Sequence, residues 1–331
     1  MTKFFKSSWQ LIKETGTEFS NDNASTLASA LSYNTLFSLA PILIIVIALG
    51  GMIFGHQAVE GEIFNQFKSF IGADGAKQLQ DLLKSAYQPG KSIVTTIIAT
   101  VLLIFGATSV FYQLQMSLNT IWQVKPKPKK SLLKYLRDRV LSFGLIIAIG
   151  FLLLVSFGIS AALAGFSQYL AQFISKDSVI LLSALDIVLS LIVTTFLFAL
   201  IFKVLPDASI NWGDVWVGSG VTAALFIVSK YLIGLYLSKS NIASTYGAAG
   251  FIVLILLWVY YSSIMLFLGA EFTKAWATSY GKPIEPSEYA VRIKSVEVEQ
   301  APTETPKQFE KKADIIEKKA DKPITAGTPA S

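Results

Sequence analysis

The chain has no cysteine and only one histidine, His56, among its 331 residues. These absences exclude a disulfide framework, a thiolate metal site and any centre that needs several histidines. Charged residues are also scarce, at 15% against roughly 25% in an average soluble domain. Hydrophobic residues make up 53% of the chain, and the mean hydropathy is +0.54. So few charges could not cover the surface of a water-soluble protein, and the composition therefore predicts an integral membrane protein.

Stretches without charge locate the membrane spans, because a helix needs about 20 apolar residues to cross roughly 30 Å of hydrocarbon. Four charge-free stretches are each long enough for one helix but too short for two, and two further apolar stretches carry one charge each. No stretch alternates as a membrane β-strand does. We therefore expect an all-α, polytopic membrane protein whose transmembrane domain covers residues 25–275. The six predicted transmembrane helices are residues 33–54, 93–114, 140–165, 179–202, 215–237 and 248–271.

Lysine and arginine gather in the segments on one side of the predicted spans, and this bias sets the orientation. The densest group is the segment 115–139, which holds seven basic residues. We therefore expect both termini on the cytoplasmic side. The segment either sets topology alone or also binds anionic lipid headgroups, since a basic residue near a membrane surface contributes about 1 kcal/mol. The candidate lipid-contacting residues are Lys125, Lys127, Lys129 and Lys130.

Three segments lie outside the predicted spans. Residues 1–24 form a cytoplasmic segment in which residues 3–20 have the pattern of an amphipathic helix lying in the membrane interface. Residues 57–88 form the longest external loop, with two short amphipathic helices predicted on either side of Gly72 and Gly75. Residues 276–331 form a charged tail rich in proline, lysine and glutamate, which is predicted to be disordered and cytoplasmic.

Polar residues inside predicted spans are the best pointers to function in a membrane protein. Asp186 and Lys230 lie at similar depth in neighbouring spans, where they either pair or reach the outer interface separately. Glu271 ends the last span, where it serves either as an interfacial ion-pair partner or in transport. Pro41 lies inside the first span and predicts a helix kink. The candidate polar path comprises Asp186, Lys230, Glu271, Asn119 and Gln115.

Several local strings resemble those of the YihY/virulence factor BrkB family of bacterial inner-membrane proteins. They are Phe37-Ser-Leu-Ala-Pro41, Leu118-Asn-Thr-Ile-Trp122, Pro206-Asp-Ala-Ser-Ile210 with Trp212, Tyr246-Gly-Ala-Ala-Gly250, Leu257-Trp-Val-Tyr-Tyr-Ser262 and Gly269-Ala-Glu-Phe272. Together they cover about residues 25–275. The resemblance implies six spans, cytoplasmic termini and a location in the bacterial inner membrane. Some members of the family are linked to serum resistance, and some are suspected of moving lipids or lipopolysaccharide precursors.

Two functions fit these observations. The first is a transporter or flippase for lipids or lipopolysaccharide precursors, and the alternative is a non-transporting scaffold that acts through its cytoplasmic tail. The family once carried the label ribonuclease BN, but a metal-dependent nuclease needs clustered carboxylates or histidines. The sequence shows one histidine and no carboxylate cluster outside the tail. We therefore expect no enzyme activity, no cofactor or metal, and no nucleic-acid partner; membrane lipids are the expected partners.

Overall fold

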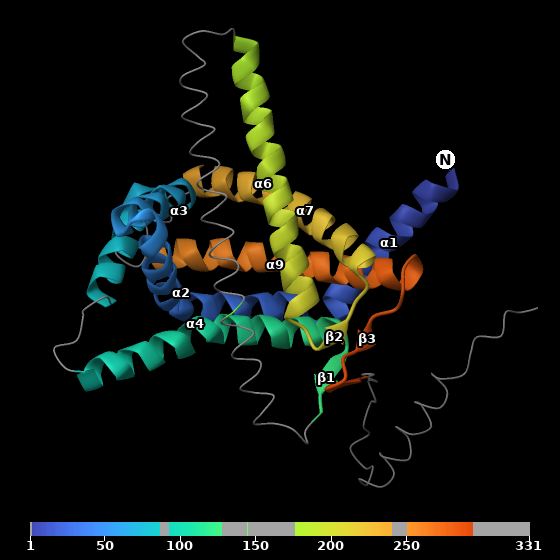
Figure 1. The fold of residues 1–331 in the computed structure, drawn as a ribbon. Coiled ribbons are helices and arrows are strands. Elements are labelled where there is room, and N and C mark those ends of the chain that lie inside the picture. Colours follow the sequence, from blue (N-terminus) through green and yellow to red (C-terminus); the bar gives the residue numbers. More distant parts are fainter. Residues whose placement is uncertain (1, 87–92, 128–143, 145–175, 240–249, 294–331) are drawn as a thin grey trace, which may run out of the picture. The chain divides into compact units, whose positions relative to one another are not determined.

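The computed structural model describes residues 2–86, 93–127, 144, 176–239 and 250–293, and the described part is mostly helical, as predicted (Figure 1). Its long helices are α1 (Thr2–Asn21), α2 (Ala24–Phe54), α3 (His56–Ala86), α4 (Ile93–Ile121), α6 (Lys176–Val204), α7 (Trp212–Lys239) and α9 (Gly250–Ser279). Four short strands join them, namely β1 (Val124–Pro126), β2 (Ala208–Ser209), β3 (Glu285–Pro286) and β4 (Ala290–Arg292). The strands were not predicted.

Four helices in the described part of the chain are long and apolar enough to cross a membrane: Ala24–Met52, Ile187–Val204, Trp212–Tyr236 and Ile252–Ser279. They coincide with the predicted spans 33–54, 179–202, 215–237 and 248–271. Helix α4 covers the predicted span 93–114 and continues to Ile121, while the predicted span 140–165 lies outside the described residues. That the chain crosses the membrane six times, and not only through these four helices, stays a prediction.

Helix α9 lies between α2 and α7 and packs against both (Figure 1). Its contact with α7 is reciprocal, since a Cβ added to Gly218 would overlap Thr273 and one added to Gly269 would overlap Thr222. Each threonine hydroxyl also donates to the carbonyl four residues earlier in its own helix, at 2.7 Å. Two Gly-xxx-Thr patterns thus bring the backbones of α7 and α9 close together, as small residues do between membrane helices.

The largest buried cluster gathers one end of each of five helices. It joins the start of α2, the ends of α4, α6 and α9, and the start of α7. Phe202 and Phe267 are fully buried at its centre, and the Trp122 ring stands edge-on to Phe202 with centroids 5.9 Å apart. Trp122 Nε1 also donates to the Ala270 carbonyl at 3.2 Å, which fixes the end of α4 against α9.

The strands show that the predicted tail 276–331 begins too early. Helix α9 continues to Ser279, β3 pairs antiparallel with β2, and β4 pairs with β1. The Lys127 backbone N–H donates to the Tyr289 carbonyl at 2.8 Å, and Lys127 Nζ donates to the Glu288 carbonyl at 2.9 Å. Composition alone missed this segment because its order comes from backbone pairing with distant loops. The rest of the predicted tail, residues 294–331, lies outside the described residues.

The two short helices predicted within residues 57–88 are one helix, α3, of 31 residues. A glycine inside a helix costs about 1 kcal/mol relative to alanine, which is why Gly72 and Gly75 were interpreted as a break. That cost is offset because residues from both halves of α3, including Val59 and Leu79, pack against Leu43 and Ile44 of α2. The predicted N-terminal helix over residues 3–20 is present as α1.

Candidate functional site

Glu271 of α9 is a charged residue with a completely buried side chain, at 0% exposure. It lies between Gly269 and Thr273, the two positions through which α9 approaches α7 most closely. This close packing removes water from the same turn of the helix. A carboxylate in such a place needs partners, because burying an unpaired charge is strongly unfavourable.

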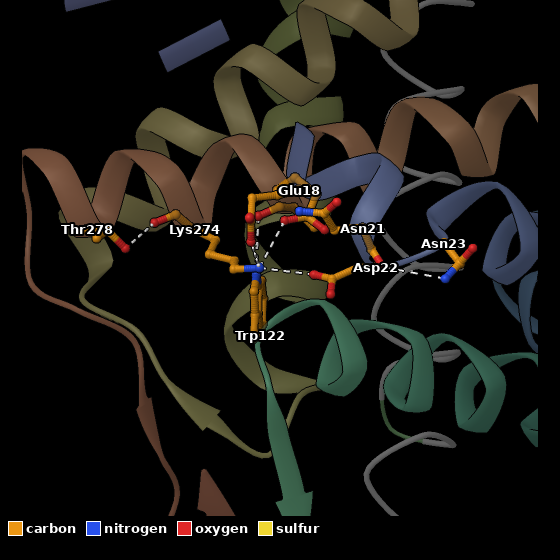
Figure 2. A network of polar contacts seen from close by, with 9 residues as sticks. Glu18, Asn21, Asp22, Asn23, Trp122, Lys274 and Thr278 are labelled. Atoms are coloured by element: carbon orange, nitrogen blue, oxygen red, sulfur yellow. Dashed lines mark hydrogen bonds and ion pairs between the residues drawn. The ribbon is translucent and has the colours of Figure 1, made fainter. Parts of the chain in front are cut away.

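Lys274, one turn further along α9, is the partner of Glu271. It is also the partner of Glu18 at the end of α1 and of Asp22 in the turn that follows (Figure 2). Its Nζ lies 2.8 Å from Glu18 Oε2, 3.0 Å from Asp22 Oδ2 and 3.4 Å from Glu271 Oε2. The Lys274 side chain is 17% exposed, and those of Glu18 and Asp22 are 31% and 16% exposed. One ammonium thus holds three largely desolvated carboxylates and ties the N-terminal helix to the last span.

Glu18 and Asp22 reach this point because of their spacing along α1 and the turn that directly follows it. Leu11, Thr15, Glu18 and Asp22 follow one another at intervals of three or four residues, which places them on one helix face. Leu11 and Thr15 are buried at 6% and 5% exposure, and α1 packs against α9. The buried stripe of α1 therefore ends in two carboxylates that face Lys274.

The cluster corrects the expectation that the chain has no carboxylate cluster outside its tail. Glu18, Asp22 and Glu271 each place one oxygen within 4.8 Å of the others. Lys274 is the ammonium that bonds to all three. The Glu271 Oε1 atom is buried and has no hydrogen-bond partner among the described residues. The expectation failed because the acids of α1 and α9 are distant in sequence and meet only in the folded chain.

Asn119 and Asp207 form a second buried polar contact, at the end of α4. Asn119 Nδ2 donates to Asp207 Oδ2 at 2.9 Å, and the Asp207 backbone N–H donates to Asn119 Oδ1 at 2.8 Å. The Asp207 carbonyl accepts from the Ser287 N–H at 2.9 Å, next to the β2–β3 pair. Asn119 thus fixes the α6–α7 connection and, through it, the start of the C-terminal segment. Gln115, one turn earlier on α4, is also buried.

A cavity of about 170 Å³ lies between α2 and α3. Its wall is mostly apolar, and three polar side chains, His56, Glu60 and Gln80, also line it. His56 and Glu60 are exposed, whereas the wall residues Ile44, Ile63, Ala76, Leu79 and Leu83 are buried. An apolar cavity with polar groups at an exposed edge suits a ligand that is itself partly apolar and partly polar.

Two members of the predicted polar path lie in different buried contacts. Glu271 belongs to the acidic cluster, while Asn119 bonds to Asp207, as described above. Lys230 is exposed on α7, and the side chain of Asp186 is outside the described part of α6, so their pairing stays a prediction. Pro41 lies inside the continuous helix α2, and its ring faces Gly106 of α4, where an added Cβ would lie 2.9 Å from Pro41 Cγ. The kink itself stays a prediction.

Sequence reasoning missed Glu18, Asp22, His56 and Glu60 as members of a site. A signal for the first two was available, because two acids four residues apart continue the buried stripe of an amphipathic helix. No comparable signal marked the cavity, since its shape depends on how α3 packs against α2.

Comparison with known proteins places these features in a family. The sequence model described as virulence factor BrkB matches residues 15–292. A UPF0761 membrane protein of Azotobacter vinelandii is 27% identical over 80% of this chain and 61% of its own length. Another, from Rhodospirillum centenum, is 28% identical over 77% of this chain and 54% of its own length. A third, from Vibrio atlanticus, is 28% identical over 78% of this chain and 80% of its own length.

The chain spans 61% and 54% of the first two of these relatives, which is well under two thirds of their length. No solved structure matches it. The family model nevertheless covers most of the chain, including the acidic cluster, the Asn119–Asp207 contact and the cavity between α2 and α3. The chain is an integral membrane protein that belongs to the virulence factor BrkB family.

Proposed function

We propose that this protein is a non-enzymatic transporter of amphiphiles in the bacterial inner membrane, and specifically a flippase for lipids or lipopolysaccharide precursors. The observation that carries the proposal is the cavity between α2 and α3. A lipid has an apolar chain and a polar head, and the cavity offers an apolar wall beside His56, Glu60 and Gln80.

The size of the cavity limits what it holds. Pockets for whole drug-sized ligands measure roughly 300–1,000 Å³, so a cavity of about 170 Å³ takes only part of a lipid. One segment of an acyl chain fits in the cavity while the rest of the lipid stays in the bilayer. Glu60 and His56 are then placed to bond an amine or a phosphate of the headgroup.

The direction of the helices supports an orientation with this cavity on the outer side. One buried cluster contains the helix ends that are predicted to be cytoplasmic. They are the start of α2, the start of α7 and the ends of α4, α6 and α9. Lys125 and Lys127 follow α4 at the same end and are exposed. These basic residues are therefore placed to meet anionic headgroups of the cytoplasmic leaflet.

Headgroup translocation in proteoliposomes tests the proposal. Purified protein is expected to speed the movement of a labelled phospholipid between leaflets, and Ala76→Leu or Ala48→Leu is expected to slow it by filling the cavity. Asn65→Ala, an exposed α3 position that does not line the cavity, is the matched control. Protein-containing vesicles that translocate no faster than empty ones contradict the proposal.

A scaffold that acts through its C-terminal segment is the alternative. The strand pairs attach residues 285–292 to the loops after α4 and α6, so a deletion must start beyond them to leave the helices intact. Deleting residues 294–331 is expected to leave translocation unchanged. If this deletion removes the cellular phenotype while Ala76→Leu does not, the scaffold explains the protein better than transport does.

A further inference from the structure

The polar edge of the cavity between α2 and α3 is negatively charged. Three polar side chains line this cavity, namely His56, Glu60 and Gln80. Of the described residues that line it, Glu60 alone carries a formal charge at pH 7, since the histidine counts as neutral. No lysine or arginine is among these lining residues. A headgroup that reaches the cavity therefore meets a carboxylate and no cation in the cavity wall.

The first two turns of α3 place this carboxylate beside the apolar wall. His56, Glu60 and Ile63 follow one another at intervals of four and three residues, so they share one face of the helix. His56 and Glu60 are exposed, whereas Ile63 is buried. The His56 ring lies against α2, because a Cβ added to Gly51 would be 2.7 Å from its Nδ1. The lining face of α3 thus runs from an exposed polar end to a buried apolar one.

We propose that the cavity selects amphiphiles whose headgroup carries a primary amine, such as a phosphoethanolamine group, over amphiphiles whose headgroup is anionic. The Glu60 carboxylate accepts hydrogen bonds from the ammonium of the headgroup, and a segment of the acyl chain lies against Ile63 and Leu79. Hydrogen bonds between an ammonium and a carboxylate are charge-assisted and stronger than those between neutral groups. This inference rests on the transport proposed above and names the substrate class of the same site.

The cavity wall and volume agree with such a ligand. A dry cavity of about 150 Å³ lined by Leu, Ile and Phe takes up benzene, so about 170 Å³ has room for a comparable length of acyl chain. A quaternary amine is bound by cages of Trp, Tyr or Phe rings. Phe64 is the one residue of these three types among the described residues of the lining. A single ring does not form a cage, and the carboxylate therefore favours an amine that donates hydrogen bonds.

Translocation of two phospholipids in phosphatidylcholine vesicles tests this inference with the full-length protein. Both lipids carry the same fluorescent acyl chain at low concentration, and one has an ethanolamine headgroup while the other has a glycerol headgroup. We expect the ethanolamine lipid to cross about two to five times faster, which is the factor that an ion pair exposed to water contributes. Glu60→Gln keeps the shape of the side chain and is expected to remove this preference. Glu60→Lys is expected to reverse it.

Glu62→Gln is the matched control, because Glu62 has the same charge, lies on α3 and does not line the cavity. Its preference is expected to equal that of the unmodified protein. Equal rates for the two lipids in the unmodified protein, or a preference that Glu60→Gln retains, overturn the assignment to an amine and leave transport itself standing. A preference that Glu62→Gln also removes overturns it in favour of general surface charge. If neither lipid crosses faster than in empty vesicles, the proposed transport fails and this inference with it.

Discussion

Replacing Lys274 by methionine tests the bonding of the acidic cluster most directly. The substitution keeps the length of the stem and removes the ammonium that bonds three carboxylates. Removing one partner of a buried ion pair costs about 3–5 kcal/mol. The side chains of Glu18 and Asp22 are 31% and 16% exposed and regain some hydration when the ammonium is lost. We therefore expect the loss in unfolding free energy to lie at the lower end of this range, at about 3 kcal/mol.

Glu271→Gln is the informative counterpart, because glutamine has the same shape and cannot carry a negative charge. Its amide oxygen still accepts from Lys274, and repulsion from Glu18 and Asp22 falls. We therefore expect a change in unfolding free energy below about 1 kcal/mol, in either direction. In the double variant Lys274→Met with Glu271→Gln, the cost of losing the ammonium is expected to shrink, because the two residues are directly coupled.

The assay is reversible denaturation of the purified protein in detergent. At roughly 2–4 °C per kcal/mol, the single lysine variant is expected to melt roughly 6–12 °C lower. A cost for Glu271→Gln that exceeds the cost for Lys274→Met would refute the reasoning, since it would show that the cluster depends more on the Glu271 carboxyl group than on the Lys274 ammonium.

Two further substitutions test the packing around this site. Asn119→Ala removes two buried hydrogen bonds to Asp207, one of them to its carboxylate, and is expected to cost about 2 kcal/mol in the same assay; an unchanged melting curve would contradict this. Gly269→Ala pushes a methyl group into Thr222 and is expected to cost about 1–3 kcal/mol. Gly220→Ala on α7, which meets nothing within 4 Å, is expected to be neutral or slightly stabilising.

The sequence alone located much of the helical architecture, because charge is excluded from long apolar helices and the gaps between charges are visible to the eye. The four membrane-length helices found at predicted positions follow from this rule. It could not reveal α3 as one helix, since only the packing of Val59 and Leu79 on α2 offsets the cost of its glycines. Nor could it reveal β3 and β4, whose partners are distant in the chain.

Of the acidic cluster, the sequence analysis singled out Glu271 alone. Glu271 stood out as an acid at the end of an apolar span, but its bonding depends on Glu18 and Asp22, some 250 residues earlier in the chain. Long-range pairs between charges leave no periodic trace in a single sequence. Asp186 and Lys230 stood out by the same reasoning as Glu271, which shows that an unusual position identifies a candidate without identifying its partner.

The acidic cluster and the cavity lie near opposite ends of α2, and this separation leads to a last prediction. Ala24 follows the turn that joins α1 to α2, and Ile44 lines the cavity. At 1.5 Å per residue the twenty residues between them span about 30 Å, which is the thickness of the hydrocarbon core. The two sites are therefore expected to lie at opposite membrane surfaces.

Single cysteines can test this without background, because the chain has none of its own. Lys13→Cys on α1 and Gln57→Cys on α3 both replace exposed residues. In intact spheroplasts, a membrane-impermeant maleimide is expected to label position 57 at once and position 13 only after permeabilisation. Labelling of both positions before permeabilisation would place the cluster and the cavity on the same side. The cavity could then not receive lipid from the leaflet opposite the acidic cluster, and the orientation proposed for the flippase would be wrong.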